Sequence, residues 1–138
     1  MFLLDTNVVS ELRRPEKANK NVLAWVSSHP ISNFFISAIT VLELELGVLQ
    51  IARKDSVQGH ILRTWMDNQV LPLFQGRILT VDTLIAQICA KIHVPNPCSE
   101  RDALIAATAL AHNMSVVTRN ISDFEPTGVR IINPWNHP

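Results

Sequence analysis

Acidic side chains follow two short apolar runs of the sequence. Asp5 comes directly after the run at residues 2–4, and Asp123 follows the run at residues 116–117 after a short polar stretch. An acid that abuts a buried strand must be paired, hydrogen-bonded or bound to a metal ion. Since sites in parallel sheets form beyond the carboxyl ends of the strands, both acids can belong to one site. Asp123, taken alone, is equally compatible with a turn before Phe124.

Two further acids stand near the start of predicted helices. Glu43 follows Thr40 in the pattern T-x-x-E, and Asp102 follows Ser99 in the pattern S-x-x-D. Taken alone, each fits a capping box, in which the carboxylate accepts a hydrogen bond from the backbone N–H of the capping residue. Because each helix begins just after a polar segment, each acid can also face the same rim as Asp5. Both interpretations stay open at this point.

Four converging carboxylates would repel one another strongly. Two such charges about 4 Å apart cost roughly 1 kcal/mol in water and about 4 kcal/mol at an effective dielectric constant of about 20. Such a cluster must take up protons or bind a cation. All-oxygen ligands favour Mg²⁺ or Mn²⁺ over zinc. The histidines are scattered, without an H-x-x-x-H pattern, at positions His29, His60, His93, His112 and His137.

The composition predicts a single globular domain over residues 1–138. Lys plus Arg and Asp plus Glu each number 12, so the formal net charge is zero. This balance argues against a polybasic binder, although charge gathered on one face still permits nucleic acid binding. No apolar run approaches the roughly 20 residues of a membrane span, and no signal peptide is visible, so we expect a cytoplasmic protein. Cys89 and Cys98 lack a C-x-x-C pattern and fit free thiols in a reducing compartment.

The elements that must position the acids alternate between strands and helices. Apolar runs predict strands at residues 2–4, 34–36, 77–81, 116–118 and 129–132. Helical patterns lie at residues 8–14, 16–28, 40–54, 56–74, 82–93 and 101–113. The alternation predicts an α/β fold with a short, mostly parallel central sheet covered by helices on both faces. With only 4 glycines, the chain has neither a G-x-G-x-x-G motif nor a P-loop.

Apolar residues are abundant on the predicted helices. The apolar side of helix 40–54 is expected at Leu42, Leu46, Leu49 and Ile51. The following helix adds Ile61, Leu62, Trp65 and Met66. Each of these residues alone fits an ordinary core, whereas together they are compatible with an exposed patch for a partner.

Four sequence motifs, in this order along the chain, carry a family resemblance. They are LLDTN at residues 3–7, TVLELELG at 40–47, DALIAATALA at 102–111 and VTRNISDF at 117–124. Together they resemble the PIN-domain toxins of the VapC/FitB type. The resemblance covers residues 2–134, and it is specific because the motifs occur together, in order and suitably spaced.

The resemblance implies a metal-dependent endoribonuclease that is the toxin of a toxin–antitoxin pair. It carries the acidic quartet over to Asp5, Glu43, Asp102 and Asp123, which would hold Mg²⁺ or Mn²⁺. Hydrolysis of RNA phosphodiesters would leave a 5′-phosphate and a 3′-hydroxyl, with tRNA as the substrate that the family favours. The supporting polar positions carry over to Asn7, Thr118 and Asn120.

Two other residues of the second motif have separate expectations. Glu45 lies about 200° around the helix from Glu43 and should point elsewhere. Gly47 matches the family glycine, and we expect it to permit close helix packing.

The segments that would meet RNA are less clearly defined by the sequence. Residues 13–20 hold four basic side chains against Glu16, a local balance of +3: Arg13, Arg14, Lys17 and Lys20. They either grip RNA phosphates beside the site or form a solvated helix face. The approach to Asp102 at residues 95–101 departs from the family pattern. Within it, Arg101 either pairs with a neighbouring acid or contacts RNA, and Glu100 is expected to be solvated rather than an auxiliary acid of the site.

The partners that the resemblance implies are a second copy of the chain and a cognate antitoxin that covers the acidic site. Operator DNA would be bound only through the antitoxin. Two alternatives with the same fold stay open: a housekeeping RNA-processing nuclease and a catalytically silent binding module. A haloacid dehalogenase-type phosphatase also has an acid after its first strand, but it needs a second Asp where Asn7 stands.

Overall fold

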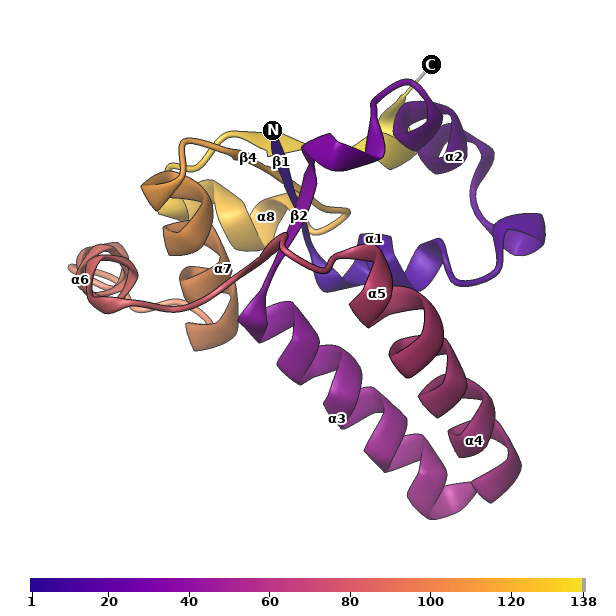
Figure 1. Cartoon of the computed structure of the whole chain (residues 1–138). Coiled ribbons are helices and arrows are strands. Elements are labelled where there is room, and N and C mark those ends of the chain that lie inside the picture. Colours follow the sequence, from indigo (N-terminus) through magenta and orange to yellow (C-terminus); the bar gives the residue numbers. More distant parts are fainter. Residues whose placement is uncertain (138) are drawn as a thin grey trace.

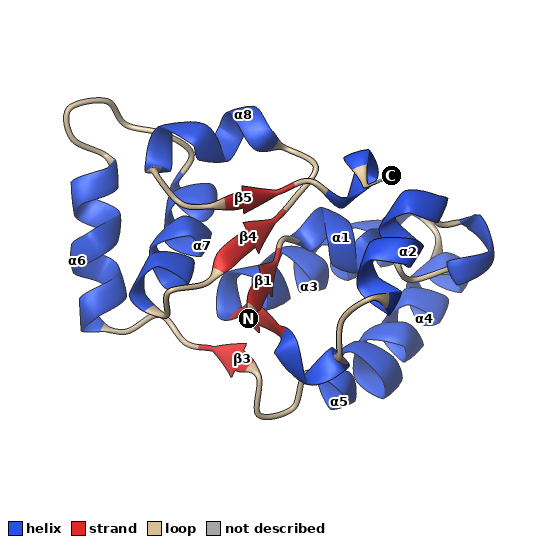
Figure 2. Cartoon of the chain, turned by 90° about the horizontal axis from the view of Figure 1, so that it is seen from above, coloured by secondary structure: helices blue, strands red, loops and turns tan. Residues whose placement is uncertain are grey.

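A computed structural model describes residues 1–137 and contains a five-stranded sheet in the order β3-β2-β1-β4-β5 (Figure 2). The four strand pairs are all parallel. The strands are β1 (Phe2–Leu4), β2 (Phe34–Ser37), β3 (Ile78–Leu79), β4 (Ser115–Val117) and β5 (Ile131–Ile132). The predicted parallel α/β sheet is therefore confirmed, with β3 and β5 shorter than the apolar runs that predicted them.

The helices occupy the segments between these strands (Figure 1). The α-helices are α1 (Thr6–Glu11), α2 (Lys20–Ser27), α3 (Ala38–Lys54), α4 (Ser56–Trp65), α5 (Leu71–Leu73), α6 (Thr83–Ile92), α7 (Glu100–Ala111) and α8 (Ile121–Phe124). Short 3₁₀ turns cover Pro15–Lys17, Ile31–Asn33, Glu125–Thr127 and Pro134–Asn136. A π-helical turn at Met66–Val70 joins α4 to α5. Within residues 1–137, none of these helices combines the length and the hydropathy that a membrane crossing requires.

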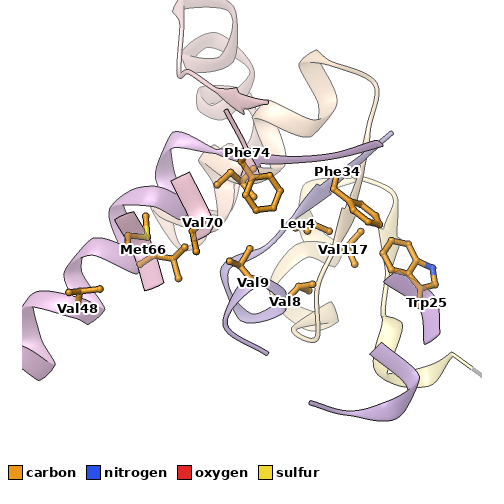
Figure 3. Packing of buried hydrophobic residues seen from close by; sticks show 12 residues of the cluster. Leu4, Val8, Val9, Trp25, Phe34, Val48, Met66, Val70, Phe74 and Val117 are labelled. Atoms are coloured by element: carbon orange, nitrogen blue, oxygen red, sulfur yellow. The ribbon is translucent and has the colours of Figure 1, made fainter. Parts of the chain in front are cut away.

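Alternate residues of the central strands enter two separate cores. Leu3 and Val116 pack with side chains of α7 and α8, whereas Leu4 and Val117 pack with side chains of α1, α2 and α3. Figure 3 shows Leu4 and Val117 beside Phe34 and the helical residues of the second core. Each buried Leu or Val contributes about 1.5–3 kcal/mol of hydrophobic free energy. The period of two along the strands thus holds helices on both faces of the sheet.

Helix α7 lies close to the sheet because its inner side is built of alanines. Ala106 and Ala109 belong to the core against the sheet, and Ala103 and Ala107 to a third cluster shared with α6. All four are fully buried. Because α7 leads back into β4, the helix runs antiparallel to the strands, and its first turn lies at their carboxyl ends.

Two predicted helix boundaries were wrong, for reasons of capping. The helix expected at residues 8–14 begins at Thr6, because the carboxylate of Asp5 caps it by accepting the Thr6 backbone N–H at 2.8 Å. The helix expected at residues 16–28 begins only at Lys20. Asn19 caps it by accepting the backbone N–H groups of Asn21 and Val22.

The helix predicted over residues 56–74 changes its hydrogen-bonding pattern near its end. After α4, the π-helical turn is closed by the backbone N–H of Leu71, which donates to the carbonyl of Met66. Pro72 follows immediately and has no backbone N–H of its own. A wider turn next to a proline lets the chain continue in a helical path without the bond that proline cannot make.

The apolar face of α3 was predicted on the wrong side. Leu44 and Val48 are buried, whereas Leu42 and Leu49 are 45% and 60% exposed. Ile51 is also exposed. The spacing of four residues between Leu44 and Val48 keeps them on one helical stripe, and that stripe faces the core under β1. Of the residues considered for a partner surface, Leu42, Leu49 and Ile61 are exposed, whereas Met66 is buried in the core.

The close helix contact lies at a different glycine from the one predicted. A side chain at Gly59 of α4 would come within 2.4 Å of the Cα and Cβ atoms of Ala52 on α3. At Gly47 an added Cβ would meet nothing within 4 Å. Gly59 therefore allows α3 and α4 to pack as a close pair, and the expectation for Gly47 was wrong.

Candidate active site

Asp5 lies at the carboxyl end of β1 and is only 4% exposed. Its Oδ2 accepts hydrogen bonds from the Thr118 hydroxyl at 2.8 Å and from Asn7 Nδ2 at 3.3 Å. Its Oδ1 accepts the backbone N–H of Thr6. Burial raises the pKa of Asp5, Thr118 and Thr6 lower it, and the charges of Glu43 and Asp123 raise it. Burial and the neighbouring acids therefore disfavour the ionised carboxylate of Asp5, whereas the hydrogen bonds from Thr118 and Thr6 favour it.

The supporting polar residues form a network around Asp5. Asn7 Nδ2 also donates to the Thr118 hydroxyl oxygen at 3.2 Å, and Asn7 Oδ1 accepts the backbone N–H of Arg119. The Asn120 backbone N–H donates to the Thr118 hydroxyl oxygen at 3.0 Å. Thr118 is fully buried between them. Asn7 and Thr118 thus fix the carboxylate plane of Asp5, and the Asn120 backbone orients the Thr118 hydroxyl.

Glu43 approaches the site from α3. This helix begins at Ala38 after its N-cap Ser37, so Glu43 is the sixth helical residue and does not take part in a capping box with Thr40. Glu43 Oε1 accepts a hydrogen bond from the Thr6 hydroxyl at 2.7 Å. Its Oε2 lies 3.8 Å from Nη1 of Arg101. The capping interpretation of Glu43 is therefore wrong.

Asp102 occupies the first turn of α7. Ser99 is the N-cap of this helix, but its side chain makes no capping hydrogen bond to the backbone. Desolvation by burial is the largest cause that raises the pKa of Asp102 from 3.8 to about 6. The charges of Asp5, Asp123 and Glu43 add to this rise in that order, and a hydrogen bond with Ser99 opposes it.

Asp123 takes a different position from the other three acids. It is exposed on α8, after β4. Its charge nevertheless raises the pKa values of both Asp5 and Asp102. Asp123 is therefore an electrostatic neighbour of the cluster at the sheet edge.

A cleft of about 460 Å³ opens over the carboxyl ends of the strands. Its lining residues are Asp5, Thr6, Asn7, Ser10, Glu11, Glu43, Asp102 and Asn120. Sequence reasoning missed Thr6, Ser10 and Glu11 as parts of this site. Their signal was helical spacing, since Ser10 and Glu11 follow Thr6 and Asn7 by four residues and so share their face of α1.

The donor chemistry of the cleft suits a hard divalent cation. Four of its lining residues carry carboxylates, and the pKa values of Asp5 and Asp102 are raised in part by neighbouring acids. Within residues 1–137, no three acidic, histidine or cysteine side chains stand close enough to enclose one ion. Mg²⁺ does not require such a cage, because proteins commonly hold it through one or two carboxylates together with waters and substrate phosphates.

The basic segment lies beside the acidic cleft. Ser10 and Glu11 of the cleft also line a smaller pocket together with Arg13, Arg14 and Lys17. These side chains stand on a turn and a 3₁₀ helix, and Arg14 and Lys17 are exposed, so the alternative of a solvated segment stays open. Lys20 stands apart, exposed at the first position of α2.

Comparisons with known proteins agree with this architecture. The family described as PIN domain matches residues 2–125. The chain is 39% identical to Toxin FitB of Neisseria gonorrhoeae, covering 99% of each. It is also 39% identical to VapC ribonuclease Y4jK of Sinorhizobium fredii, covering 98% of each.

A solved structure gives the same assignment in three dimensions. The structure of FitAB bound to the IR36 DNA fragment superposes with a TM-score of 0.88 and 40% identity, covering 99% of this chain and 96% of that one. The family match spans most of the sequence, and the relatives are similar over nearly their whole length. The chain therefore belongs to the PIN domain family.

Proposed function

We propose that this protein is a divalent-metal-dependent endoribonuclease and the toxin of a toxin–antitoxin pair. The observation that carries the proposal is the acidic cleft at the carboxyl ends of β1 and β4, where Asp5, Glu43 and Asp102 meet. The full-length relatives named as a toxin and as a ribonuclease support the same activity. They favour a toxin over a housekeeping nuclease of the same fold.

Asp5, Glu43, Asp102 and Asp123 would together hold Mg²⁺ or Mn²⁺. When bound, the cation supplies positive charge that activates a water molecule and neutralises charge developing on the attacked phosphate. Asp5 is the best-positioned ligand, because Thr118 and Asn7 already fix its carboxylate. Asp102, with a pKa of about 6, is ionised at neutral pH and ready to accept the cation.

The chain's own residues would orient the reacting groups. The Thr6 hydroxyl bonds to Glu43 and aims that carboxylate into the cleft. Asn120 lines the same cleft and can donate to a phosphate oxygen or a water. The deep position of Asp5 limits its solvation, which strengthens its attraction for a cation. These residues would prepare a site for hydrolysis of an RNA phosphodiester.

The RNA would approach along the basic side of the cleft. Arg13, Arg14 and Lys17 share a pocket with two residues of the acidic site, so they can hold phosphates next to the cleaved one. Lys20 would add a longer-range attraction. Such contacts recognise the backbone without reading sequence. The family favours tRNA as the substrate.

A cognate antitoxin would control this activity by covering the acidic cleft, and a second copy of the chain would complete a homodimer. The related structure of FitAB bound to a DNA fragment supports a complex with a partner protein and DNA. Operator DNA would then be contacted by the antitoxin and not by the chain described here.

Cleavage assays on the chain and its Asp5→Asn variant test the proposal. Each protein is incubated with total tRNA, and separately with total RNA, in Mg²⁺, Mn²⁺ or EDTA. We expect discrete fragments with 5′-phosphate ends from the wild type with metal, and at least a hundred-fold slower cleavage by Asp5→Asn. Circular dichroism checks that the variant is folded. Cleavage in EDTA, or wild-type rates in Asp5→Asn, would refute the assignment.

A further inference from the structure

Arg101 contacts the acidic cluster but is not hydrogen-bonded into the fold. It is the second residue of α7, its side chain is 50% exposed, and its Nη1 lies 3.8 Å from Glu43 Oε2. Within residues 1–137, Arg63, Arg77 and Arg130 donate side-chain hydrogen bonds to other groups of the chain, whereas the guanidinium of Arg101, like those of Arg13, Arg14, Arg53 and Arg119, donates none. Its five donors are therefore available to a ligand.

Arg101 contributes little to the stability of the folded chain at this position. A cation in the first turn of a helix is repelled by the helix dipole, which favours acids there. The contact with Glu43 is long and half exposed, and such pairs contribute little. Glu43 is already held by Thr6 through its other oxygen. The guanidinium can thus leave Glu43 at small cost.

An acidic cleft that cleaves RNA needs positive charge to bind the RNA phosphates, in addition to the cation that its carboxylates bind. The carboxylates that attract a cation repel an approaching phosphodiester. Within residues 1–137, Arg101 is the one cationic side chain that lies within 4 Å of a carboxylate of the quartet. The planar fork of a guanidinium matches two phosphate oxygens, and such charge-assisted bonds are among the strongest in proteins.

We propose that Arg101 is a substrate-binding residue that exchanges Glu43 for a phosphate of the RNA when the substrate enters the cleft. The inference rests on the ribonuclease function proposed above. It assigns to this arginine the anchoring of a phosphate at or next to the scissile bond, on the α7 side of the cleft. The basic segment at residues 13–17 would hold the strand on the other side.

The test compares Arg101→Gln with Arg53→Gln, which removes the same charge from the far end of α3. Binding of fluorescently labelled tRNA is measured at several salt concentrations, with EDTA present to remove divalent metal and so prevent cleavage. A tRNA is a suitable probe because phosphate contacts do not depend on sequence. We expect Arg101→Gln to weaken binding about ten-fold and to reduce the salt slope by about one. Arg53→Gln should bind like the wild type. Arg101→Lys should keep the salt slope and lose only part of the affinity.

Two results would overturn the inference. Equal tRNA binding by Arg101→Gln and wild type would remove Arg101 from the RNA interface. Unchanged tRNA binding together with several-fold tighter Mn²⁺ binding in calorimetry would instead show that Arg101 competes with the cation for Glu43. Failure of the ribonuclease proposal is seen separately, in a wild-type chain that cleaves no RNA with either metal. The binding comparison is informative in both cases, because it needs no turnover.

Discussion

Asp5 combines a structural role with the chemical role proposed for it at one position. As the N-cap of α1 it accepts the Thr6 backbone N–H, and as the residue after β1 it presents its other oxygen to Thr118 and Asn7. A buried carboxylate without such partners would be strongly unfavourable. These hydrogen bonds keep an acid in an almost solvent-free place, where its attraction for a cation is least screened by water.

Asp102 supplies a prediction about pH. Its pKa of about 6 in the folded chain exceeds the ordinary 3.8, so its ionisation opposes folding above the folded pKa. We expect Asp102→Asn to raise the free energy of unfolding at pH 7, without divalent metal, by about 1–2 kcal/mol after allowance for solvent screening. As the pH falls through about 6 toward 4, the folded wild type gains a proton and the advantage disappears.

Urea unfolding in EDTA at several pH values measures this effect. The control Asp67→Asn removes an exposed carboxyl that pairs with Arg63, away from the cleft. It should not reproduce the rise in stability at neutral pH. A stabilisation by Asp102→Asn that is the same at pH 4 and pH 7 would show that the ionisation of Asp102 is not its cause.

At the scale of elements, two helices bring acids to the same edge of the sheet from different directions. Helix α3 starts at the carboxyl end of β2 and carries Glu43 in its second turn. Helix α7 runs back toward β4 and carries Asp102 in its first turn. In an all-parallel sheet both turns lie beyond the carboxyl ends of the strands. The site thus depends on where these helices begin.

The contact between α3 and α4 gives a prediction about stability. Gly59→Ala would place a Cβ 2.4 Å from Ala52, and we expect a loss of about 1–3 kcal/mol through overpacking. Gly47→Ala meets no neighbour within 4 Å, and its better helix propensity should add up to about 1 kcal/mol. Denaturant unfolding compares the two. Opposite signs are expected, and a stabilising Gly59→Ala would contradict the packing described for this helix pair.

At the scale of the whole molecule, the acidic cleft gathers negatively charged side chains that repel one another in the folded chain. A cation that binds only the folded chain stabilises it by mass action, by about 2.7 kcal/mol at a hundred times its dissociation constant. For a chain of 138 residues we expect the melting temperature to rise by about 10 °C in saturating Mg²⁺ or Mn²⁺ and to return in EDTA.

The matched control for this rise is NaCl at equal ionic strength, which screens the acids without binding between them. In Asp5→Asn the metal-induced rise should fall to less than half. An identical shift in the wild type and Asp5→Asn would mean that the ion binds elsewhere on the molecule.

Local patterns predicted much of the fold and many residues at the site. The apolar strands and the alternation with helices were visible because burial on both faces needs continuous apolar runs. The orientation of α3 was not predictable, because Leu42, Leu49, Leu44 and Val48 are all apolar, and only the position of the sheet chooses between the two stripes. The contact at Gly59 was missed for a related reason: the sequence does not reveal which face of a helix meets another helix.

The sequence by itself determined the parallel α/β fold, the family resemblance and the placement of Asp5 after a buried strand, because these follow from local apolar patterns and short motifs. Only the tertiary structure decided that Glu43 is bonded to Thr6 and not to a helix cap, that Asp123 stays exposed, and that Arg101 reaches Glu43. The physical reason is that these contacts join residues far apart in the chain. Their distances are set by how the helices pack on the sheet, which no local pattern encodes.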